Sequence, residues 1–253
     1  MIKKFINKRI RKYFRFRNYI PKIMFGRVFT EVLLDHMEPV NYMDGWPMKP
    51  FNGQVRRLMQ ISLIANQFKP NYAIETGTYL GTTTVYLAAM VTEQTYTIEI
   101  DKKRALSARR RFEENYSDLM INCFIGDSIL ELTRILKDIP NKDKRLIAYL
   151  DSHGHGILPT TVELQALNNW GQDWIAIIDD FKINTDSGYG FDIYNDVEVG
   201  LSVVPELPGL QVWVTKENSV LETGAKRGTG YVFTDKSASW MDQNIMLNFQ
   251  RVR

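Results

Sequence analysis

Short apolar runs alternate with amphipathic stretches along the middle of the chain. Five apolar, β-prone runs are predicted to be strands, at residues 72–75, 95–100, 121–125, 146–150 and 174–178. Helices are predicted from 3.6-residue spacing at residues 54–68, 102–116 and 129–139. This alternation predicts an α/β fold, in which a parallel sheet carries helices on both faces.

The first predicted helix, at residues 54–68, has a broad apolar side. Residues 69–71 (Lys-Pro-Asn) end it just before the first strand. The pattern places Val55, Leu58, Met59 and Leu63 on one face, which Ile61 and Ile64 widen.

The last part of the chain has a different rhythm. Two strand-like runs, at residues 210–214 and 230–234, are separated by residues 215–229, which are too polar and glycine-broken for a crossover helix. We therefore expect an antiparallel pair that closes the sheet. The predicted whole is a Rossmann-like, seven-stranded sheet that is mostly parallel and ends in an antiparallel C-terminal hairpin.

A glycine-containing turn follows the first strand, in the sequence YAIETGTYLGTTT. Gly77 and Gly81 allow a tight turn and close approach to a ligand, and residues 82–84, all threonines, can cap the next helix. A helix N-terminus suits a carboxylate or phosphate. The alternative is an ordinary strand-to-helix turn, and the spacing does not match the G-x-G-x-x-G of dinucleotide oxidoreductases.

Four successive strands end on an acid or an acid-bearing turn. Glu99 and Asp101 follow the second strand, the sequence Gly-Asp-Ser at 126–128 follows the third, Asp151 the fourth, and the pair 179–180 the fifth. Ligands of parallel sheets bind at the carboxyl ends of the strands. These acids are therefore candidate ligand contacts.

Composition limits the class of protein and its cellular compartment. The chain has 253 residues, of which 44% are hydrophobic and 24% charged, which suits one globular domain with a substantial core. Its single cysteine, Cys123, excludes an internal disulfide and fits a reducing compartment. We find no apolar run near the roughly 20 residues of a spanning helix and no signal peptide, so we expect a cytoplasmic protein.

The net charge of +3 hides a basic N-terminal arm. Residues 1–27 carry ten lysines and arginines and no acid, so the rest of the chain carries 3 − 10 = −7. Apolar residues at helical spacing beside these cations suit an anionic membrane surface, such as the inner membrane surface. Packing of the arm on its own domain or on a partner subunit, and nucleic-acid binding, are the alternatives. Elsewhere no basic and aromatic residues interleave as in a nucleic-acid channel, so we expect no nucleic-acid partner.

The chain from about residue 52 to residue 234 resembles class I S-adenosylmethionine-dependent methyltransferases. Within them it is similar to the metal-dependent O-methyltransferases, which include catechol and macrocin-type sugar O-methyltransferases. The turn ETGTYLGTTT, the acid of YTIEID and the sequence GDS carry the likeness, in the family's order. Predicted divisions are the arm at 1–27, a lid or docking segment at 28–51, and a methyltransferase domain at 52–253.

The resemblance implies a set of cofactor contacts. Turn residues would lie beside the methionine part of S-adenosylmethionine, Glu99 would hold both ribose hydroxyls, and the Asp-Ser pair at 127–128 would contact adenine. The implied cofactor-binding residues are Glu75, Gly77, Tyr79, Gly81, Thr83, Glu99, Asp127 and Ser128.

The resemblance also implies a metal site, at Asp151, Asp179 and Asp180. Three clustered carboxylates would repel one another without a cation, and Mg²⁺ is the expected ion. Magnesium often uses one or two carboxylates, so one of the three can lie outside the ion's ligands. As an alternative, Asp179 or Asp180 caps the loop or binds substrate hydroxyls directly. Lys182 and the basic residues near the C-terminal hairpin could also neutralise the acids in place of a cation.

The expected catalytic base is a histidine. The catechol enzymes use a lysine three residues after the fourth-strand aspartate, but here that position holds Gly154. His153 and His155 flank it, and either could take a proton from a metal-polarised hydroxyl, with Asp151 as the third candidate catalytic residue. They could instead bind a metal or the backbone.

The acceptor is expected to be a small molecule or a glycan. Residues 186–194, DSGYGFDIY, combine aromatic rings, carboxylates and glycines, which suits a polyhydroxylated ring. The hypothesis is O-methylation of a saccharide or glycosylated metabolite. A catechol-like or polyketide hydroxyl is the second choice, and a dinucleotide-dependent oxidoreductase or a non-catalytic cofactor-binding protein is the alternative from another class; a homo-oligomer is left open.

Overall fold

A computed structural model describes residues 49–140, 143–153 and 158–253 of the chain. Contacts divide the chain after Gly45, and every described residue belongs to the second unit, Trp46–Arg253. The arm at 1–27 and all but the last three residues of the predicted segment at 28–51 lie outside the described residues, as does His155.

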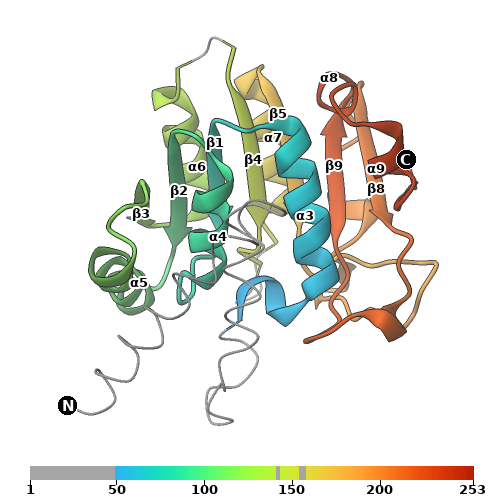
Figure 1. Cartoon of the computed structure of the whole chain (residues 1–253), viewed down its shortest axis with the longest axis horizontal. Helices are drawn as coiled ribbons and strands as arrows, with labels where there is room; N and C mark the ends of the chain where they lie inside the picture. The colour runs from blue at the N-terminus through green and yellow to red at the C-terminus, as the bar shows by residue number, and fades with distance from the viewer. Residues whose placement is uncertain (1–48, 141–142, 154–157) are drawn as a thin grey trace, which may run out of the picture. The chain divides into compact units, whose positions relative to one another are not determined.

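Figure 1 shows a twisted sheet with helices on both faces. The helices along the sheet are α3 (Val55–Phe68), α4 (Thr82–Met90), α5 (Lys102–Asn115), α6 (Ser128–Asp138) and α7 (Thr160–Trp170). Helices α6 and α7 pack together on one face, and α3, α4 and α5 cover the other. The main core lies between the sheet and the α6–α7 layer, and a smaller cluster lies under α5.

The main sheet contains eight strands in the order β10-β8-β9-β5-β4-β1-β2-β3. Strands β1 to β5 are parallel, whereas β9, β8 and β10 are added antiparallel. The strands are β1 (Tyr72–Thr76), β2 (Gln94–Glu99), β3 (Ile121–Ile125), β4 (Arg145–Leu150), β5 (Asp173–Ile178), β8 (Leu210–Thr215), β9 (Gly230–Thr234) and β10 (Phe249–Arg251).

The predicted α/β, Rossmann-like architecture is confirmed, with one correction to the strand number. All seven expected strands are present, and β10 adds an eighth beside β8. A small hairpin of β6 (Ile193–Tyr194) and β7 (Val197–Glu198) forms its own sheet after β5, and short helices α8 (Asp235–Ala238) and α9 (Gln243–Met246) precede β10. Single 3₁₀ turns lie at Pro50–Gly53, Leu201–Val203 and Ser219–Leu221.

The buried face of α3 differs from the prediction. Met59 and Leu63, expected on the apolar face, are 44% and 43% exposed, whereas Ile61 and Ile64 are fully buried. The apolar side of this helix is too broad for spacing alone to decide which part meets the sheet.

The strand order creates the binding edge. From β1 the chain proceeds to β2 and β3 on one side, and β4 and β5 lie on the other. Connections therefore diverge between β1 and β4, where ligands of open α/β sheets bind. The amide of Asp151, just after β4, donates to the carbonyl of Thr76 at the end of β1, 2.9 Å away.

Candidate active site

Two adjoining cavities lie at this edge of the sheet. The first, of about 290 Å³, is lined by residues that follow β1, β2, β3 and β4. The second, of about 200 Å³, lies between the Pro50–Gly53 turn, the β1–α4 turn and Asp179. Gly77, Tyr79 and Asp151 line both, so the two cavities are direct neighbours.

Gly77 brings the β1–α4 turn against the end of β4. Its φ is +90°, and a Cβ there would lie 2.1 Å from the carbonyl oxygen of Asp151. Gly81, at φ +71°, is the N-cap of α4. The expected threonine caps are wrong, because no side chain caps this helix. Instead the Thr83 hydroxyl accepts a hydrogen bond from the amide of Phe51, which leaves its own proton free to donate.

Glu75 lies beneath the turn and is 1% exposed. The hydroxyls of Thr84 and Thr97 both donate to its Oε2, the latter over 2.7 Å. Burial raises the pKa of Glu75 to about 7, against the effect of these hydrogen bonds. Glu75 lines the second cavity, so this predicted cofactor contact lies at the site, although its carboxylate is already bound by the two threonine hydroxyls.

Glu99 presents a carboxylate to the first cavity. Its Oε2 accepts from the amide of Tyr79 (2.7 Å) and its Oε1 from the amide of Asp101 (2.9 Å). A carboxylate has about four acceptor positions, so two remain for ligand hydroxyls. Tyr79 itself has a left-handed backbone, at φ +48°, and the guanidinium of Arg104 lies 5.1 Å above its ring.

The Asp-Ser pair after β3 lines the same cavity. Asp127 caps α6, because its side chain accepts from the amide of Ile129 (2.8 Å). The Ser128 hydroxyl donates to Ser152, which in turn donates to the buried Glu163 (3.2 and 2.7 Å). The cavity therefore brings together the predicted ribose and adenine contacts.

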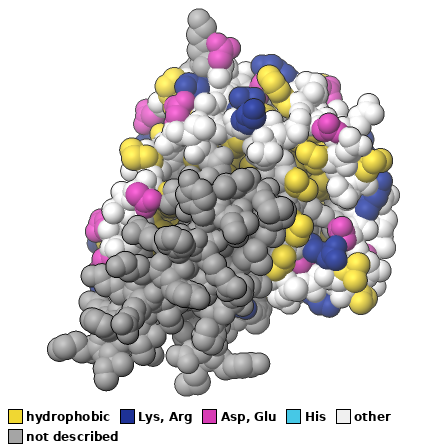
Figure 2. Space-filling view, viewed as in Figure 1, with side chains coloured by type: hydrophobic (Ala, Val, Ile, Leu, Met, Phe, Trp, Pro, Cys, Tyr) yellow, Lys and Arg dark blue, Asp and Glu magenta, His cyan; other side chains and the backbone are white. Residues whose placement is uncertain are grey.

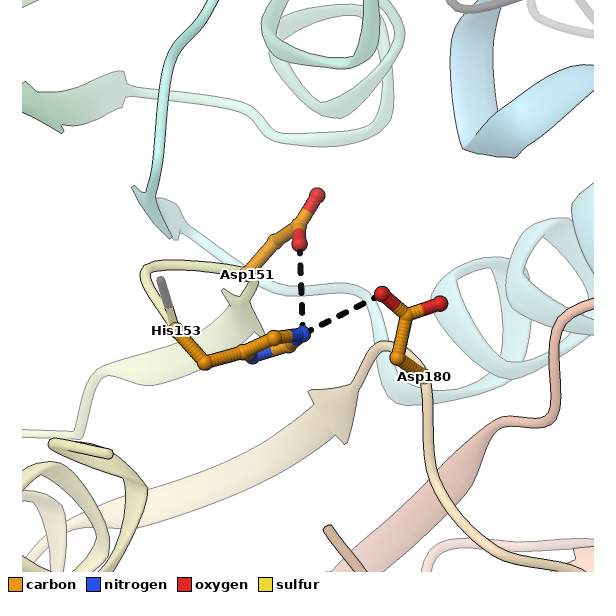
Figure 3. A group of neighbouring side chains, drawn as sticks. All are labelled: Asp151, His153 and Asp180. Atoms are coloured by element: carbon orange, nitrogen blue, oxygen red, sulfur yellow. Dashed lines mark hydrogen bonds and ion pairs between the residues drawn. The ribbon is translucent and has the colours of Figure 1, made fainter. Parts of the chain in front are cut away.

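Asp151, His153 and Asp180 converge in front of β4 and β5 (Figure 3). His153 Nε2 lies 3.3 Å from Asp180 Oδ2 and 3.7 Å from Asp151 Oδ1. The His153 side chain is 2% exposed, whereas that of Asp151, which lines the cavity, is 36% exposed. Arg227 also pairs with Asp180, through its Nε, and with Asp192.

The charges of this cluster shift its pKa values. Desolvation and then the charges of Asp179 and Asp180 raise the pKa of Asp151 well above its usual value. Burial would lower the pKa of His153, but its hydrogen bond to Asp180 and the surrounding carboxylates raise it overall.

Asp179 does not join this cluster. It is 1% exposed, and each of its oxygens accepts from two donors. Oδ1 accepts from Arg57 (2.5 Å) and the amide of Asp180 (2.7 Å), and Oδ2 from Tyr149 (2.7 Å) and Asn52 (2.8 Å). Burial would raise the pKa of Asp179, but Arg57 and the Tyr149 hydroxyl lower it. Its acceptor positions are thus filled by protein donors.

The donor set can hold one divalent cation, but it is not the set of three carboxylates that the sequence predicted. One oxygen each from Asp151 and Asp180 and one nitrogen of His153 all lie within 4.8 Å of one another. Mg²⁺ prefers oxygen and often uses only one or two carboxylates with water, whereas imidazole suits transition metals. The two aspartates therefore fit Mg²⁺ when His153 stays unligated.

Sequence reasoning missed Arg57 and Asn52, whereas Arg227 is one of the basic residues near the C-terminal hairpin that were expected as alternative partners of the acids. A signal for Arg57 exists, because it shares 3.5-residue spacing with the buried Ile61, Ile64 and Phe68. An arginine on a buried helix face needs an acid partner.

Neither a family model nor a curated protein matches the sequence. The structure is similar to solved structures. One is an O-methyltransferase from Bacillus cereus in complex with SAH, with 14% identity, 86% of this chain and 96% of that chain covered, and a TM-score of 0.49. Another is a putative O-methyltransferase from Klebsiella pneumoniae, with 15% identity, 86% and 95% covered, and a TM-score of 0.48. A third is the O-methyltransferase TomG from Streptomyces achromogenes with SAM (15%; 68% and 76%; 0.45). At such identities a likeness concerns the fold alone, so the chemistry is argued from this chain's own residues.

Proposed function

We propose that the protein transfers the methyl group of S-adenosylmethionine to a hydroxyl oxygen of an acceptor. The observation that supports this most is that a cavity with the Glu99 carboxylate adjoins the Asp151–His153–Asp180 cluster. A ribose diol suits the free acceptor positions of Glu99. The cofactor's carboxylate suits the N-terminus of α4 and the Thr83 hydroxyl.

Methyl transfer requires the acceptor hydroxyl to lose a proton while its oxygen attacks the methyl carbon. The C–O bond forms as the C–S bond breaks, and neutral S-adenosylhomocysteine is released. His153 is the proposed proton acceptor. In its neutral tautomer with the proton on Nδ1, Nε2 takes the proton of the acceptor hydroxyl, and the carboxylates of Asp151 and Asp180, 3.7 and 3.3 Å from Nε2, stabilise the resulting imidazolium. The chain's main contribution is to hold acceptor oxygen and methyl group in line.

A divalent cation is proposed to assist, with Mg²⁺ the first ion to test. Asp151 and Asp180 would hold it, and when bound it would stabilise the developing alkoxide. Asp179 is left out of this proposal because its oxygens are already filled. The Nε2 lone pair of His153 can either bind a cation or take the proton, but not both. If His153 is the base, the cation is therefore held by the two carboxylates and by water alone.

A saccharide hydroxyl is the proposed acceptor class. Tyr194 lies beside His153, with ring centres 5.8 Å apart, and Asp192 and Arg227 lie next to it. An aromatic face next to charged hydrogen-bonding groups suits a polyhydroxylated ring. A catechol-like or polyketide hydroxyl remains the second candidate, favoured by the same aromatic ring.

Two measurements test the proposal. Calorimetry should show S-adenosylmethionine and S-adenosylhomocysteine binding in preference to NAD(H), weakened by Glu99→Ala but not by the remote Glu206→Gln. Transfer of labelled methyl groups to glycans should fall in His153→Gln, Asp151→Asn and Asp180→Asn far more than cofactor binding does. Tighter binding of NAD(H) would refute S-adenosylmethionine as the cofactor. Full activity in the presence of a chelator would refute the role of a divalent cation.

A further inference from the structure

Arg57 is a buried cation at the centre of the site's supporting structure. Its side chain is 1% exposed on the inner face of α3. A buried guanidinium is stable only when paired and hydrogen-bonded. Arg57 Nη1 donates to Asp179 (2.5 Å) and to the Tyr149 hydroxyl (3.1 Å), so its charge is matched by Asp179, which stands outside the Asp151–His153–Asp180 cluster.

The contact between Arg57 and Asp179 continues into Asp180. Asp179 Oδ1 accepts from Arg57 and also from the backbone amide of Asp180 (2.7 Å). Asp180 has a φ of +53°, which is uncommon for a residue with a Cβ and persists only when surrounding structure holds it. The bond to Asp179 is one such restraint, so the position of Asp180 depends on that of Asp179.

Arg57 also holds the other partner of Asp180. Its Nη2 donates to the backbone carbonyls of Arg227 (2.5 Å) and Gly228 (3.2 Å). Gln54, one turn earlier, accepts from and donates to the backbone of Arg227 (2.7 and 2.9 Å). Arg227 in turn pairs with Asp180 through its side chain. The start of α3 therefore fixes Asp180 from two sides.

We propose that Arg57 is a positioning residue that takes the place of a metal ion at Asp179 and holds the Asp180 carboxylate against His153. The role deepens the proposed function and rests on it for its effect on turnover. It also gives the adjacent residues Asp179 and Asp180 different roles. Asp179 has all its acceptor positions filled by protein donors, whereas Asp180 pairs with Arg227 through Oδ1 and keeps Oδ2 towards His153.

Loss of Arg57 should disturb Asp180 and leave the first cavity, which contains Glu99, intact. Without the guanidinium, Asp179 is a buried charge that lacks its main partner. Either the 179–180 turn must shift or the Asp179 carboxylate must take up a proton. Lysine keeps the charge, but its single ammonium cannot reproduce the fork that spans a carboxylate and two carbonyls. Neither Arg57 nor any of its hydrogen-bond partners lines the first cavity, so the contacts that Glu99 and the Asp-Ser pair offer the cofactor should survive.

The experiment compares Arg57→Lys and Arg57→Met with the adjacent control Arg56→Met. Arg56 also pairs with an acid, Glu217 at 2.5 Å, but at the surface. Histidine-selective ¹⁵N labelling is practicable because the chain has three histidines. The His153 side-chain signals report its contact with Asp180 without any acceptor, and Asp180→Asn provides the reference for a lost contact.

The two Arg57 variants should move the His153 signals toward those of Asp180→Asn, while Arg56→Met leaves them unchanged. The kcat of methyl transfer per folded molecule should fall about tenfold or more, with the cofactor Kd within about twofold. If Arg57→Met does not fold, Arg57→Lys carries the test. Unmoved His153 signals in a folded Arg57 variant overturn the positioning role, even if the enzyme is active. A wild-type protein without methyl transfer refutes the proposed function instead, while the spectra still test the positioning.

Discussion

Two glycines with similar backbone angles differ at the residue scale in what surrounds them. Gly77 (φ +90°) faces the carbonyl of Asp151, whereas a Cβ added at Gly171 (φ +75°) would meet nothing within 4 Å. Alanine at either site would have to adopt a left-handed backbone, which costs about 1–2 kcal/mol. Only at Gly77 does it also collide with the strand end that shapes the site.

Gly77→Ala should therefore lose cofactor binding, whereas Gly171→Ala should keep it. We expect Gly77→Ala to be destabilised by more than the backbone penalty of about 1–2 kcal/mol that both share. Chemical denaturation and calorimetry with S-adenosylhomocysteine measure the two effects. Equal loss of binding in both variants would show that general destabilisation, not the approach to Asp151, is responsible.

Glu75 should make stability depend on pH. Its pKa is about 7 in the folded protein because of burial, against about 4.3 in an unfolded chain. Between these values the folded state holds the extra proton, so the free energy of unfolding falls as pH rises and levels off above about 7. The loss is on the order of 3 kcal/mol.

Glu75→Gln should remove this dependence, since glutamine can still accept from Thr84 and Thr97. The variant should be about as stable as the wild type near pH 5, and more stable near pH 8 by up to roughly 3 kcal/mol. Denaturation curves at the two pH values give the comparison. A difference of the same size at both values would mean that Glu75 does not bind the proton.

At the element scale, burial decides what could be predicted. The runs at 121–125 and 230–234 match β3 and β9, and the other expected strands agree to within one residue. Central parallel strands are buried on both faces and so form continuous apolar runs. β10, β6 and β7 were missed because two or three residues carry no readable pattern.

The site was predictable where it depends on strand ends and unpredictable where it depends on long-range pairing. Acids after successive parallel strands must meet at one edge, which brings Asp151 and Asp180 together. The partner of Asp179 could not be found this way, because Arg57 lies 122 positions away on a helix. Sequence spacing gives the face of a helix but not the side chain opposite it.

Helix α3 offers a test of its buried face. Ile61 is fully buried and Leu63 is 43% exposed, although both lie on its broad apolar side. Ile61→Ala should lower the free energy of unfolding by about 2–5 kcal/mol, and Leu63→Ala by less than about 1 kcal/mol. Urea denaturation of the two variants compares them. A larger cost at Leu63 would mean that this face is covered in solution.

At the scale of the whole molecule, charge is divided unevenly along the chain. Residues 1–27 carry +10, and the remainder carries −7. On the face shown in Figure 2, charged side chains of both signs are scattered over the described part. Among the described helices none is long and apolar enough to cross a membrane. With this division of charge, attraction to an anionic surface is expected to come mainly from residues 1–27, whose structure lies outside the described range.

Removal of residues 1–27 should abolish binding to anionic vesicles and leave cofactor affinity unchanged. Each lysine or arginine near such a surface contributes about 1 kcal/mol, so ten of them suffice for binding at low salt, and salt should release the protein. Vesicle sedimentation with full-length and truncated protein, on anionic and uncharged lipid, measures this. Replacing the ten basic residues by glutamine is the matched control for length.

If the full-length chain does not bind anionic vesicles at low salt, the arm instead packs on its own domain or on a partner subunit. A change in sedimentation coefficient on truncation separates those two outcomes.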